Sequence, residues 1–268
     1  MKKNGLFKYG DTVTLWDRRE RQYMFTLTIG KRFESHIGNV EHDDLIGQPE
    51  GSWVTTNKGH LLLAFRPTKA EYTVNMKRIA TVVYPKDIGI ILSYANIYPG
   101  AKVIEAGSGS GALTIALSDA VGSTGAVISY DVREDMSNLA KANLEAVAEF
   151  PQNVTFKVGN LQEETLDSDC DSAVLDMPEP WHCIENVSSS LKLGGVLLTF
   201  LPTVMQVSDL VESLRKSGKY ALISTREILE RPWQIEGRSV RPMHRMVGHT
   251  GFITTARRYL PKDSMAND

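Results

Sequence analysis

The sequence predicts an α/β fold in which a Rossmann-like, doubly wound sheet follows a small N-terminal β-barrel-like domain. From residue 101 onward, apolar runs of strand length alternate with helix-forming runs, which is typical of a mainly parallel sheet covered by helices. Before residue 67 the runs are short, rich in β-branched and aromatic residues, and separated by frequent glycines. This second pattern favours a small barrel or sandwich. The 268 residues suffice for two domains, which we expect at 1–66 and 67–268.

The N-terminal domain is predicted to consist of short strands joined by turns. The expected strands are 11–16, 22–29, 53–56 and 60–65. The charged segment Asp17-Arg18-Arg19-Glu20-Arg21 is expected at the tip of a hairpin. A solvated turn is the ordinary interpretation of such a segment, and contact with RNA phosphates is the alternative.

A connector is predicted between the two domains. Its expected elements are helices at 68–76 and 85–97, with a strand at 79–84 between them. Pro85 is favourable at a helix start, and it holds Tyr84 in an extended conformation. Tyr84 is therefore either a packed aromatic or part of the wall of a site.

The C-terminal domain is predicted to alternate strands and helices. The expected strands are 103–106, 126–131, 154–158, 172–176, 195–201, 221–229 and 252–260. The expected helices are 112–120, 134–150, 183–191 and 204–217. Ligands of such sheets bind beyond the carboxyl ends of the strands. The polar residues found at or just past these ends are Glu105, Asp131, Asn160 and Asp176.

A glycine-rich turn, Glu105-Ala106-Gly107-Ser108-Gly109-Ser110-Gly111, joins the first of these strands to the next helix. Its glycines allow positive φ and a close approach to a ligand, and the helix start at Ala112 and Leu113 offers free N–H groups. Such a turn by itself is also an ordinary strand–helix connection. Asp131 sharpens the interpretation, because a carboxylate at the end of the second strand suits a ribose diol.

Glu105 distinguishes between two kinds of cofactor. The turn and the ribose-binding carboxylate serve both dinucleotide enzymes and methyltransferases that use S-adenosylmethionine. A carboxylate at Glu105 would repel a pyrophosphate, whereas it can face the cationic amino group of a methionine moiety. The sequence therefore favours S-adenosylmethionine.

The fourth strand ends in Asp176-Met177-Pro178-Glu179-Pro180-Trp181. The two prolines restrict the backbone. The carboxylate of Asp176 can accept a hydrogen bond from an adenine amino group, and Trp181 can stack on a base. The alternative is a rigid loop in which Asp176 caps a helix.

Charge and composition limit the other possibilities. The formal net charge is −2, so any contact with nucleic acid must come from local patches. One such patch is C-terminal and comprises Arg231, Arg238, Arg241, His244, Arg245, His249, Arg257 and Arg258. Each of these residues alone is best explained as a surface charge or a salt bridge, but as a group they suggest an RNA-facing loop. We expect no metal at the histidines, and neither a disulfide nor a metal at Cys170 and Cys183.

The sequence contains no apolar run long enough to span a membrane. Met1-Lys2-Lys3 is followed by polar sequence rather than by the apolar core of a signal peptide. We therefore expect a cytoplasmic protein.

Five blocks in order resemble the tRNA (adenine-N(1))-methyltransferases that modify the T loop, at nucleotide position 58 in most members. They are Tyr84-Pro85-Lys86-Asp87, the turn at 105–114, Tyr130-Asp131-Val132-Arg133-Glu134-Asp135, the block from Asp176 to Trp181, and His244-Arg245-Met246-Val247-Gly248-His249-Thr250-Gly251-Phe252. The resemblance covers nearly the whole chain and implies S-adenosylmethionine as methyl donor, tRNA as substrate and a homotetramer. Many members carry Glu where this chain has Asp131, and often an acid or other polar residue near Asn160. Neither departure changes the expected reaction.

The chemistry of this reaction and the positions of the motifs then suggest the roles of individual residues. Asp176 and Tyr84 are the expected catalytic residues, with Asp176 accepting from the exocyclic amine of an extruded adenine and stabilising its developing charge. The expected cofactor contacts are Glu105, Gly107, Ser108, Gly109, Ser110, Gly111, Ala112, Leu113, Asp131, Met136, Asn160, Leu161 and Asp176. The expected substrate contacts are Tyr84, Trp181, Arg241, His244, Arg245 and His249.

Three alternatives stay open at this point. An NAD-dependent oxidoreductase would share the turn and Asp131, but the Asp176–Trp181 block argues against it. A non-catalytic RNA-binding subunit of the same fold should have degraded motifs, and here they are whole. Methylation of a small molecule or a protein is the third.

Overall fold

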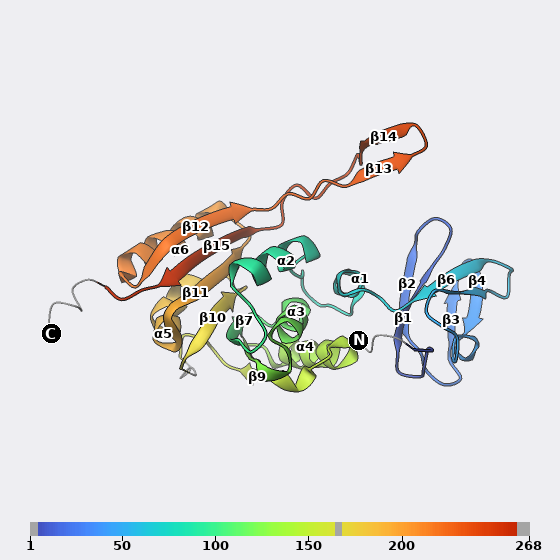
Figure 1. The fold of residues 1–268 in the computed structure, drawn as a ribbon, viewed down its shortest axis with the longest axis horizontal. Coiled ribbons are helices and arrows are strands. Elements are labelled where there is room, and N and C mark those ends of the chain that lie inside the picture. Colours follow the sequence, from blue (N-terminus) through green and yellow to red (C-terminus); the bar gives the residue numbers. More distant parts are fainter. Residues whose placement is uncertain (1–4, 164–167, 262–268) are drawn as a thin grey trace. The chain divides into compact units, whose positions relative to one another are not determined.

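A computed structural model describes residues 5–163 and 168–261 (Figure 1). The chain divides into two compact units, Met1–Met76 and Lys77–Asp268. The division falls after the first helix rather than at residue 66, so that this helix belongs to the N-terminal unit. Met1-Lys2-Lys3, on which the expectation about a signal peptide rests, lies outside the described residues.

The N-terminal unit is built on a four-stranded antiparallel sheet with strand order β2-β1-β6-β5. Its strands are β1 (Thr12–Trp16), β2 (Gln22–Thr26), β5 (Ser52–Thr55) and β6 (Leu61–Phe65). A separate hairpin is formed by β3 (Arg32–Ser35) and β4 (Gly38–Glu41), followed by the short 3-10 turn η1 (His42–Asp44). The charged segment 17–21 is the tip between β1 and β2, as predicted.

One face of this sheet forms a small core. Alternate residues of each strand point inward, because side chains in a strand alternate between its two faces. The inward set includes Val13, Leu15, Leu62 and Ala64, all at most 1% exposed. Helix α1 (Lys69–Asn75) follows β6 and begins with a capping box, in which Thr68 and Glu71 satisfy each other's backbone N–H groups.

One expectation was wrong, and one hairpin was missed. The predicted strand at 79–84 has no strand conformation. Val82 and Val83 are buried, so the apolar character of the segment reflects packing rather than sheet pairing. The β3–β4 hairpin was missed, because four-residue strands around Gly38 give little alternation to detect.

The C-terminal unit contains the doubly wound sheet that the alternation predicts. Seven strands lie in the order β12-β15-β11-β10-β7-β8-β9. They are β7 (Lys102–Ala106), β8 (Ala126–Asp131), β9 (Val154–Val158), β10 (Cys170–Leu175), β11 (Leu191–Leu201), β12 (Tyr220–Glu227) and β15 (Phe252–Arg258). The five strands from β11 to β9 are parallel, and β15 is antiparallel to both β11 and β12.

Helices cover both faces of this sheet. They are α2 (Pro85–Tyr94), α3 (Ala112–Val121), α4 (Glu134–Val147), α5 (Ile184–Ser190) and α6 (Val204–Ser217), with short 3-10 turns η2 (Gly122–Thr124), η3 (Pro151–Asn153) and η4 (Pro180–Cys183). Helices α5 and α6 bury Ile184, Val187, Leu210 and Leu214 in the core beside β10 and β11. Helix α4 ends at Val147 rather than at the predicted 150, since Ala148 after it already has extended backbone.

The order of the strands creates a switch point between β7 and β10. From β7 the chain proceeds to β8 and β9 on one side, and it later returns to β10 and β11 on the other. At such a point the connections leave in opposite directions, which opens a crevice at the carboxyl ends of the two strands. The fold therefore predicts that a ligand binds beyond Ala106 and Leu175.

A hairpin interrupts the chain between β12 and β15, and we call it the arm. It consists of β13 (Trp233–Glu236) and β14 (Ser239–Pro242), with Gly237 at positive φ in its turn. Figure 1 follows the chain out from β12 through the arm and back into β15. The basic patch around Arg241 was expected on a loop, but the arm holds part of it in paired strands. Its apolar side chains, Trp233, Ile235 and Val240, are all more than half exposed.

Candidate active site

A pocket of about 510 Å³ opens at the switch point, where the fold predicts it. Its walls come from the ends of β7, β8, β9, β10 and β11 and from the segment before α2. The lining residues are Ala80, Thr81, Ala106, Gly107, Gly109, Tyr130, Asp131, Val132, Arg133, Met136, Gly159, Asn160, Leu161, Asp176, Met177, Pro178, Phe200, Pro202 and Gln206. We call it the sheet-end pocket.

Two glycines of the turn are required by packing. A β-carbon on Gly107, which has φ of +88°, would lie 1.9 Å from the carbonyl oxygen of Asp176. A β-carbon on Gly111, which has φ of +87°, would lie 2.9 Å from the α-carbon of Ala140 on α4. The first glycine thus lets β7 and β10 end side by side, and the second lets α3 begin against α4.

Asp131 is half-buried at the pocket, and the backbone orients its carboxylate. Its Oδ2 accepts from the N–H of Gly109 at 3.0 Å, and its Oδ1 accepts from the N–H of Arg133 at 2.9 Å. Each carboxylate oxygen can accept a further hydrogen bond. The side chain is therefore held ready to accept from two hydroxyl groups of a ribose diol.

Glu105 has different surroundings from those expected. It is fully buried beneath the turn, where its Oε2 accepts from Thr114 Oγ1 at 2.7 Å and from Ser129 Oγ at 2.6 Å. Its Oε1 has no hydrogen-bond partner among the described residues. Burial raises the pKa of Glu105 to about 7. The structure does not place Glu105 in the wall of the pocket.

The other residues of the turn and of the helix start also have mainly structural contacts. Ser108 Oγ lies 2.6 Å from Ser129 Oγ, and the Ser110 carbonyl accepts from Asn143 Nδ2 at 2.9 Å. Ala112 and Leu113 are 5% and 4% exposed and do not line the pocket.

Three further lining residues, Met136, Asn160 and Leu161, are those expected beside a nucleobase. Met136 and Leu161 both line the pocket with apolar side chains. Asn160 Oδ1 accepts from the N–H of Gln162 at 3.1 Å, while its Nδ2 lies 3.3 Å from Glu163 Oε1. Asn160 thus brings both an acceptor and a donor to the edge of the pocket.

Asp176 lines the pocket immediately after β10. Its backbone N–H donates to the carbonyl of Ala106 at 2.8 Å, which extends the pairing of β10 with β7 by one residue. Burial raises the pKa of its carboxyl to about 7. The chain after it is held by Gln206, whose Nε2 donates to the Pro178 carbonyl at 3.0 Å. A carboxylate of high pKa in a pocket is the feature expected of a functional group.

Two aromatic residues expected at the substrate do not line the pocket. Tyr84 is half-buried at the start of α2, three residues after Thr81, which does line it. Trp181 packs against the core beside α5, and its Nε1 donates to His182 Nε2 at 3.1 Å.

Sequence reasoning missed the contribution of the end of β11 and of the start of α6. Phe200, Pro202 and Gln206 all line the pocket. The rule that was applied to the first four strands, that residues at the carboxyl ends face the ligand, would have found Phe200 and Pro202 as well.

The expected basic residues fall into two groups. On the arm, Arg241 Nη1 lies 2.6 Å from His244 Nε2, and Arg245 is exposed nearby. His249 lies closer to the pocket, because its Nε2 donates to the carbonyl of Pro202 at 2.7 Å and its Nδ1 lies 2.7 Å from Glu227 Oε1. The hydrogen bond with Glu227 raises the pKa of His249.

A buried network fixes the base of the arm to α2. Lys86 Nζ donates to Asp87 Oδ1 at 2.8 Å, to the Ile228 carbonyl at 2.8 Å and to Thr250 Oγ1 at 2.6 Å. Thr250 Oγ1 in turn donates to Asp87 Oδ2 at 2.8 Å. The Tyr84–Asp87 block and the block around Thr250, which are far apart in sequence, are thus parts of one structure.

Within 5–163 and 168–261, no group of three or more His, Cys, Asp and Glu side chains could hold a metal ion. The helices in the same part of the chain are all too short or too polar to cross a membrane.

The fold and the pocket together define the class of this protein, a Rossmann-like methyltransferase that depends on S-adenosylmethionine. The similarity to solved structures agrees with that class. A SAM-dependent O-methyltransferase from Thermotoga maritima superposes with a TM-score of 0.91 at 32% identity, covering 96% of each chain. The tRNA (m1A58) methyltransferase TrmI from Aquifex aeolicus gives a TM-score of 0.84 at 28% identity, covering 96% of this chain and all of the other.

The chain belongs to the tRNA methyltransferase family, as the five motif blocks led us to expect. Residues 60–241 match the family described as the tRNA methyltransferase complex GCD14 subunit, and residues 5–54 match the TrmI-like N-terminal family. A relative from Methanocaldococcus jannaschii, named tRNA (adenine(57)-N(1)/adenine(58)-N(1))-methyltransferase TrmI, is 39% identical over 91% of this chain and 93% of its own length. These findings do not favour an oxidoreductase.

Proposed function

We propose that this protein transfers a methyl group from S-adenosylmethionine to N(1) of an adenosine in the T loop of tRNA, with position 58 expected. The observation that carries the proposal is the position of Asp176, a carboxylate of raised pKa in a pocket that also holds Asp131 and the glycine-rich turn. The family and the names of its members supply the substrate.

The residues of the sheet-end pocket fit the cofactor. Asp131 presents two oriented acceptors for the ribose, and Asn160 with Met136 and Leu161 presents amide and apolar groups for an adenine. Gly107 and Gly109 leave backbone exposed between these groups, where the methionine part would lie. Glu105 would act from beneath the turn, through its hydrogen bonds with Thr114 and Ser129, rather than as a direct contact. The cofactor supplies a methyl group on a positively charged sulfur, so the chain itself needs to supply only position and electrostatics.

Asp176 is proposed to act on the target adenine. Methylation at N(1) leaves a positive charge on the base, and a carboxylate that accepts from the exocyclic amine stabilises that charge as it develops. At a pKa of about 7, the carboxyl is partly protonated at neutral pH. A nearby positive charge favours its ionised form. Binding of the positively charged cofactor would therefore favour the ionised carboxylate of Asp176, which is the form that stabilises the charge on the adenine.

Tyr84 and Trp181 remain our candidates for holding the extruded base. Each lies three residues from a lining residue, Thr81 and Pro178 respectively. Because N(1) is on the pairing edge, the base must leave its loop to react, and flat aromatic side chains suit that step because they can stack on an unpaired base. Arg241, His244, Arg245 and His249 are proposed to contact the RNA backbone.

The family resemblance also leads us to propose a homo-oligomer, a tetramer, in the cytoplasm. The exposed apolar side chains of the arm support association, since Trp233, Ile235 and Val240 would otherwise face water.

The decisive experiment is mass analysis of nucleosides from unmodified tRNA incubated with the protein and S-adenosylmethionine. We expect methyladenosine whose methyl stays with the base on fragmentation. A methyl that stays with the ribose would instead indicate O-methylation, the activity in the name of the Thermotoga relative. Absence of any methylated nucleoside, with NAD binding in place of S-adenosylmethionine by calorimetry, would contradict the proposal. Mapping of the product would show whether one adenosine or two neighbours are modified.

A further inference from the structure

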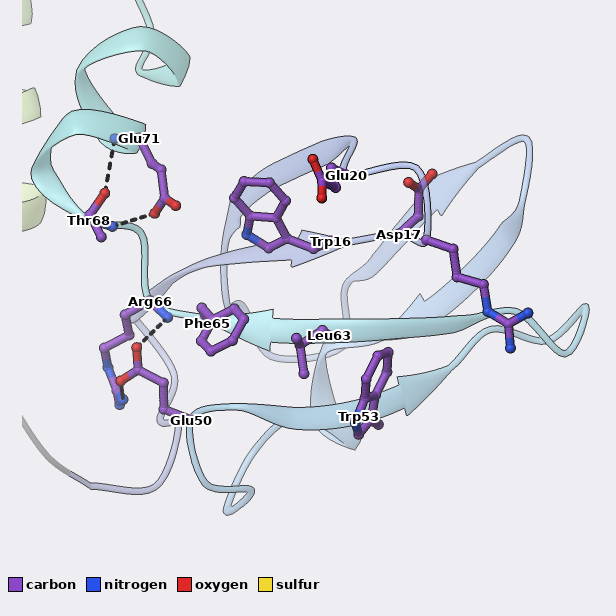
Figure 2. A pocket seen from close by; sticks show the side chains of 11 residues that line it. Trp16, Asp17, Glu20, Glu50, Trp53, Leu63, Phe65, Arg66, Thr68 and Glu71 are labelled. Atoms are coloured by element: carbon purple, nitrogen blue, oxygen red, sulfur yellow. Dashed lines mark hydrogen bonds and ion pairs between the residues drawn. The ribbon is translucent and has the colours of Figure 1, made fainter. Parts of the chain in front are cut away.

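The outer face of the N-terminal sheet carries a second pocket, of about 500 Å³. Strand register puts Trp16 opposite Leu63 and Leu63 opposite Trp53, so that these three side chains form one row across β1, β6 and β5. Phe65 lies two residues further along β6, on the same face. Figure 2 shows the three aromatic side chains grouped around Leu63. We call this the aromatic pocket.

These side chains do not belong to the core of the domain. The core takes the alternate residues of the same strands, such as Leu15, Leu62 and Val54. Trp53 is 61% exposed, an unusual position for a large apolar ring. A surface of this kind, with flat rings around an aliphatic floor, is suited to stacking with another flat group.

Most charged groups around the aromatic pocket are already paired. Arg66 binds Glu50 at 3.2 Å and Asp11 at 2.7 Å, while Glu71 accepts from the N–H of Thr68 in the capping box. Arg18 is one exception, and Glu20 is the other, since its side chain has no ion pair or hydrogen bond in the described residues and only its backbone N–H donates, to the Asp17 carbonyl at 2.9 Å. Its carboxylate at the rim is an acceptor for an amino group.

A basic pocket of about 420 Å³ adjoins the aromatic one and shares Asp17 and Arg18 with it. Its lining includes Arg19, Arg21, His36 and His60. Asp17 neutralises only Arg21, at 2.6 Å, and its Oδ1 accepts from the N–H groups of Arg19 and Arg21.

Two positive charges of the basic pocket have no ion-pair partner among the described residues. Arg18 and Arg19 are exposed and make no ion pair in the described part of the chain. Positive charges gathered at a recess of this kind complement an anion. A flat apolar subsite next to a cationic one has the form required by a nucleotide, with its base in one and its phosphate in the other.

We infer that the N-terminal domain binds an unpaired nucleotide of the tRNA, with the base stacked over Leu63 between Trp16 and Trp53 and the phosphate held by Arg18 and Arg19. The inference rests on the proposed tRNA substrate and adds a second contact to it. The contact is separate from catalysis, because none of these residues lines the sheet-end pocket. Its role is to raise affinity for tRNA. Glu20 favours a base that carries an amino group.

The test compares two variants with matched controls in the full-length protein. Trp53→Ala removes the exposed ring, and Trp53→Leu keeps its apolar bulk without the flat face. Arg18→Ala with Arg19→Ala removes the free charges. The controls are Ile29→Ala, at an apolar residue that is 72% exposed, and Lys31→Ala with Arg32→Ala, all in the same domain outside both pockets.

The readouts are tRNA affinity without cofactor, its salt dependence, and turnover at saturating tRNA. Both Trp53 variants should bind tRNA about tenfold more weakly, the magnitude usual for one stacked base. The arginine variant should lower the slope of log affinity against log salt by about 2. Turnover at saturating tRNA and the affinity for S-adenosylmethionine should stay within about twofold of the parent in all variants, because the catalytic pocket is untouched.

Several results would overturn the inference. One is tRNA affinity within twofold of the parent for Trp53→Leu. Another is a loss as large in the controls as in the test variants. If only the arginine variant loses tRNA affinity, the result would support a phosphate contact and contradict the stacked base. Equal competition with tRNA by a short unpaired RNA and by its duplex would also contradict the stacked base. Because binding is measured apart from methylation, failure of this inference is distinguishable from failure of the proposed reaction.

Discussion

Gly107 and Asp176 lie so close that a single β-carbon would not fit between them. A methyl group on Gly107 would come within 1.9 Å of the carbonyl oxygen of Asp176. The proposed cofactor turn and the proposed catalytic residue are therefore in direct backbone contact, although they are distant in the sequence. This contact explains why the turn needs its first glycine for packing as well as for its positive φ.

Gly107→Ala should disrupt both stability and activity. The new carbon meets backbone rather than a flexible side chain, and it also imposes strain at φ of +88°. We expect a fall in thermal midpoint together with a loss of methylation of at least about tenfold, since a displacement of ~1 Å at the site can cost more than that. Gly122→Ala is the control: it has φ of +65° but no atom within 4 Å of the new carbon. Equal effects of the two changes would mean that only backbone strain matters.

Asp131→Ala should weaken cofactor binding. It removes two charge-assisted hydrogen bonds, together on the order of 2–4 kcal/mol, so the dissociation constant should rise by about tenfold or much more. It also releases the N–H of Gly109 and so loosens the turn. Asp135→Ala provides a matched control, because this carboxylate pairs with Arg133 and does not line the pocket. An unchanged dissociation constant by calorimetry would rule out the role of Asp131.

Asp176→Ala should lower the rate of the chemical step far more than it lowers tRNA affinity. The proposed interaction is strongest in the transition state, and removing one such group typically costs roughly 100- to 1000-fold in rate. Asp176→Asn keeps an acceptor but loses the charge, so it should fall between. Single-turnover methylation with saturating cofactor and tRNA measures the effect, with Glu179→Ala as an exposed neighbouring control. A rate for Asp176→Ala within about threefold of the parent would make Asp176 a structural cap.

Glu105 should make the folded protein less stable as pH rises. Its pKa goes from an ordinary 4.5 to about 7 on folding. The folded state therefore holds the proton more tightly, and the contribution of Glu105 to stability is lost between these two pH values. Each pKa unit corresponds to ~1.4 kcal/mol, so roughly 3 kcal/mol is involved. Asp176 acts in the same direction.

Glu105→Gln removes one of these two contributions. The variant should lose less stability than the parent between pH 5 and 8, measured by urea unfolding at each pH. The diagnostic quantity is the change of the unfolding free energy with pH and not its absolute value. The absolute value also changes because the new amide group would occupy the position of Oε1, which has no partner in the described residues. Parallel curves for parent and variant would show that Glu105 stays charged or stays protonated across the range.

Arg241→Ala combined with Arg245→Ala should reduce the salt dependence of tRNA binding. Each phosphate contact that is lost lowers the slope of log affinity against log salt by about 1. Cofactor affinity should not change, because neither residue lines the sheet-end pocket. Arg215→Ala with Lys216→Ala, at the end of α6, removes the same charge elsewhere. If the slope of the arm variant equals that of the parent, the arm is not an RNA surface.

The order of the strands and helices in the doubly wound sheet followed from local pattern alone. Alternating strand and helix runs predicted the doubly wound sheet, and helix α6 was predicted at its observed bounds. The rule that ligands bind at the carboxyl ends of strands then brought Asp131, Asn160 and Asp176 to one pocket. The predictions of the sheet and of α6 succeeded because periodicity is a property of short segments, which the sequence states directly.

The sequence by itself determined the class of sheet and the edge of the sheet at which Asp131, Asn160 and Asp176 meet. Only the tertiary structure decided which way each side chain faces. The side chain of Glu105 lies beneath the glycine-rich turn because Thr114 and Ser129 donate hydrogen bonds to it there. Residues 79–84 do not form the predicted strand, because no strand in the described part of the chain pairs with them. The aromatic pocket needed Trp16, Leu63 and Trp53 in register across three strands. Each of these outcomes depends on contacts between residues far apart in the chain, and no local pattern records them.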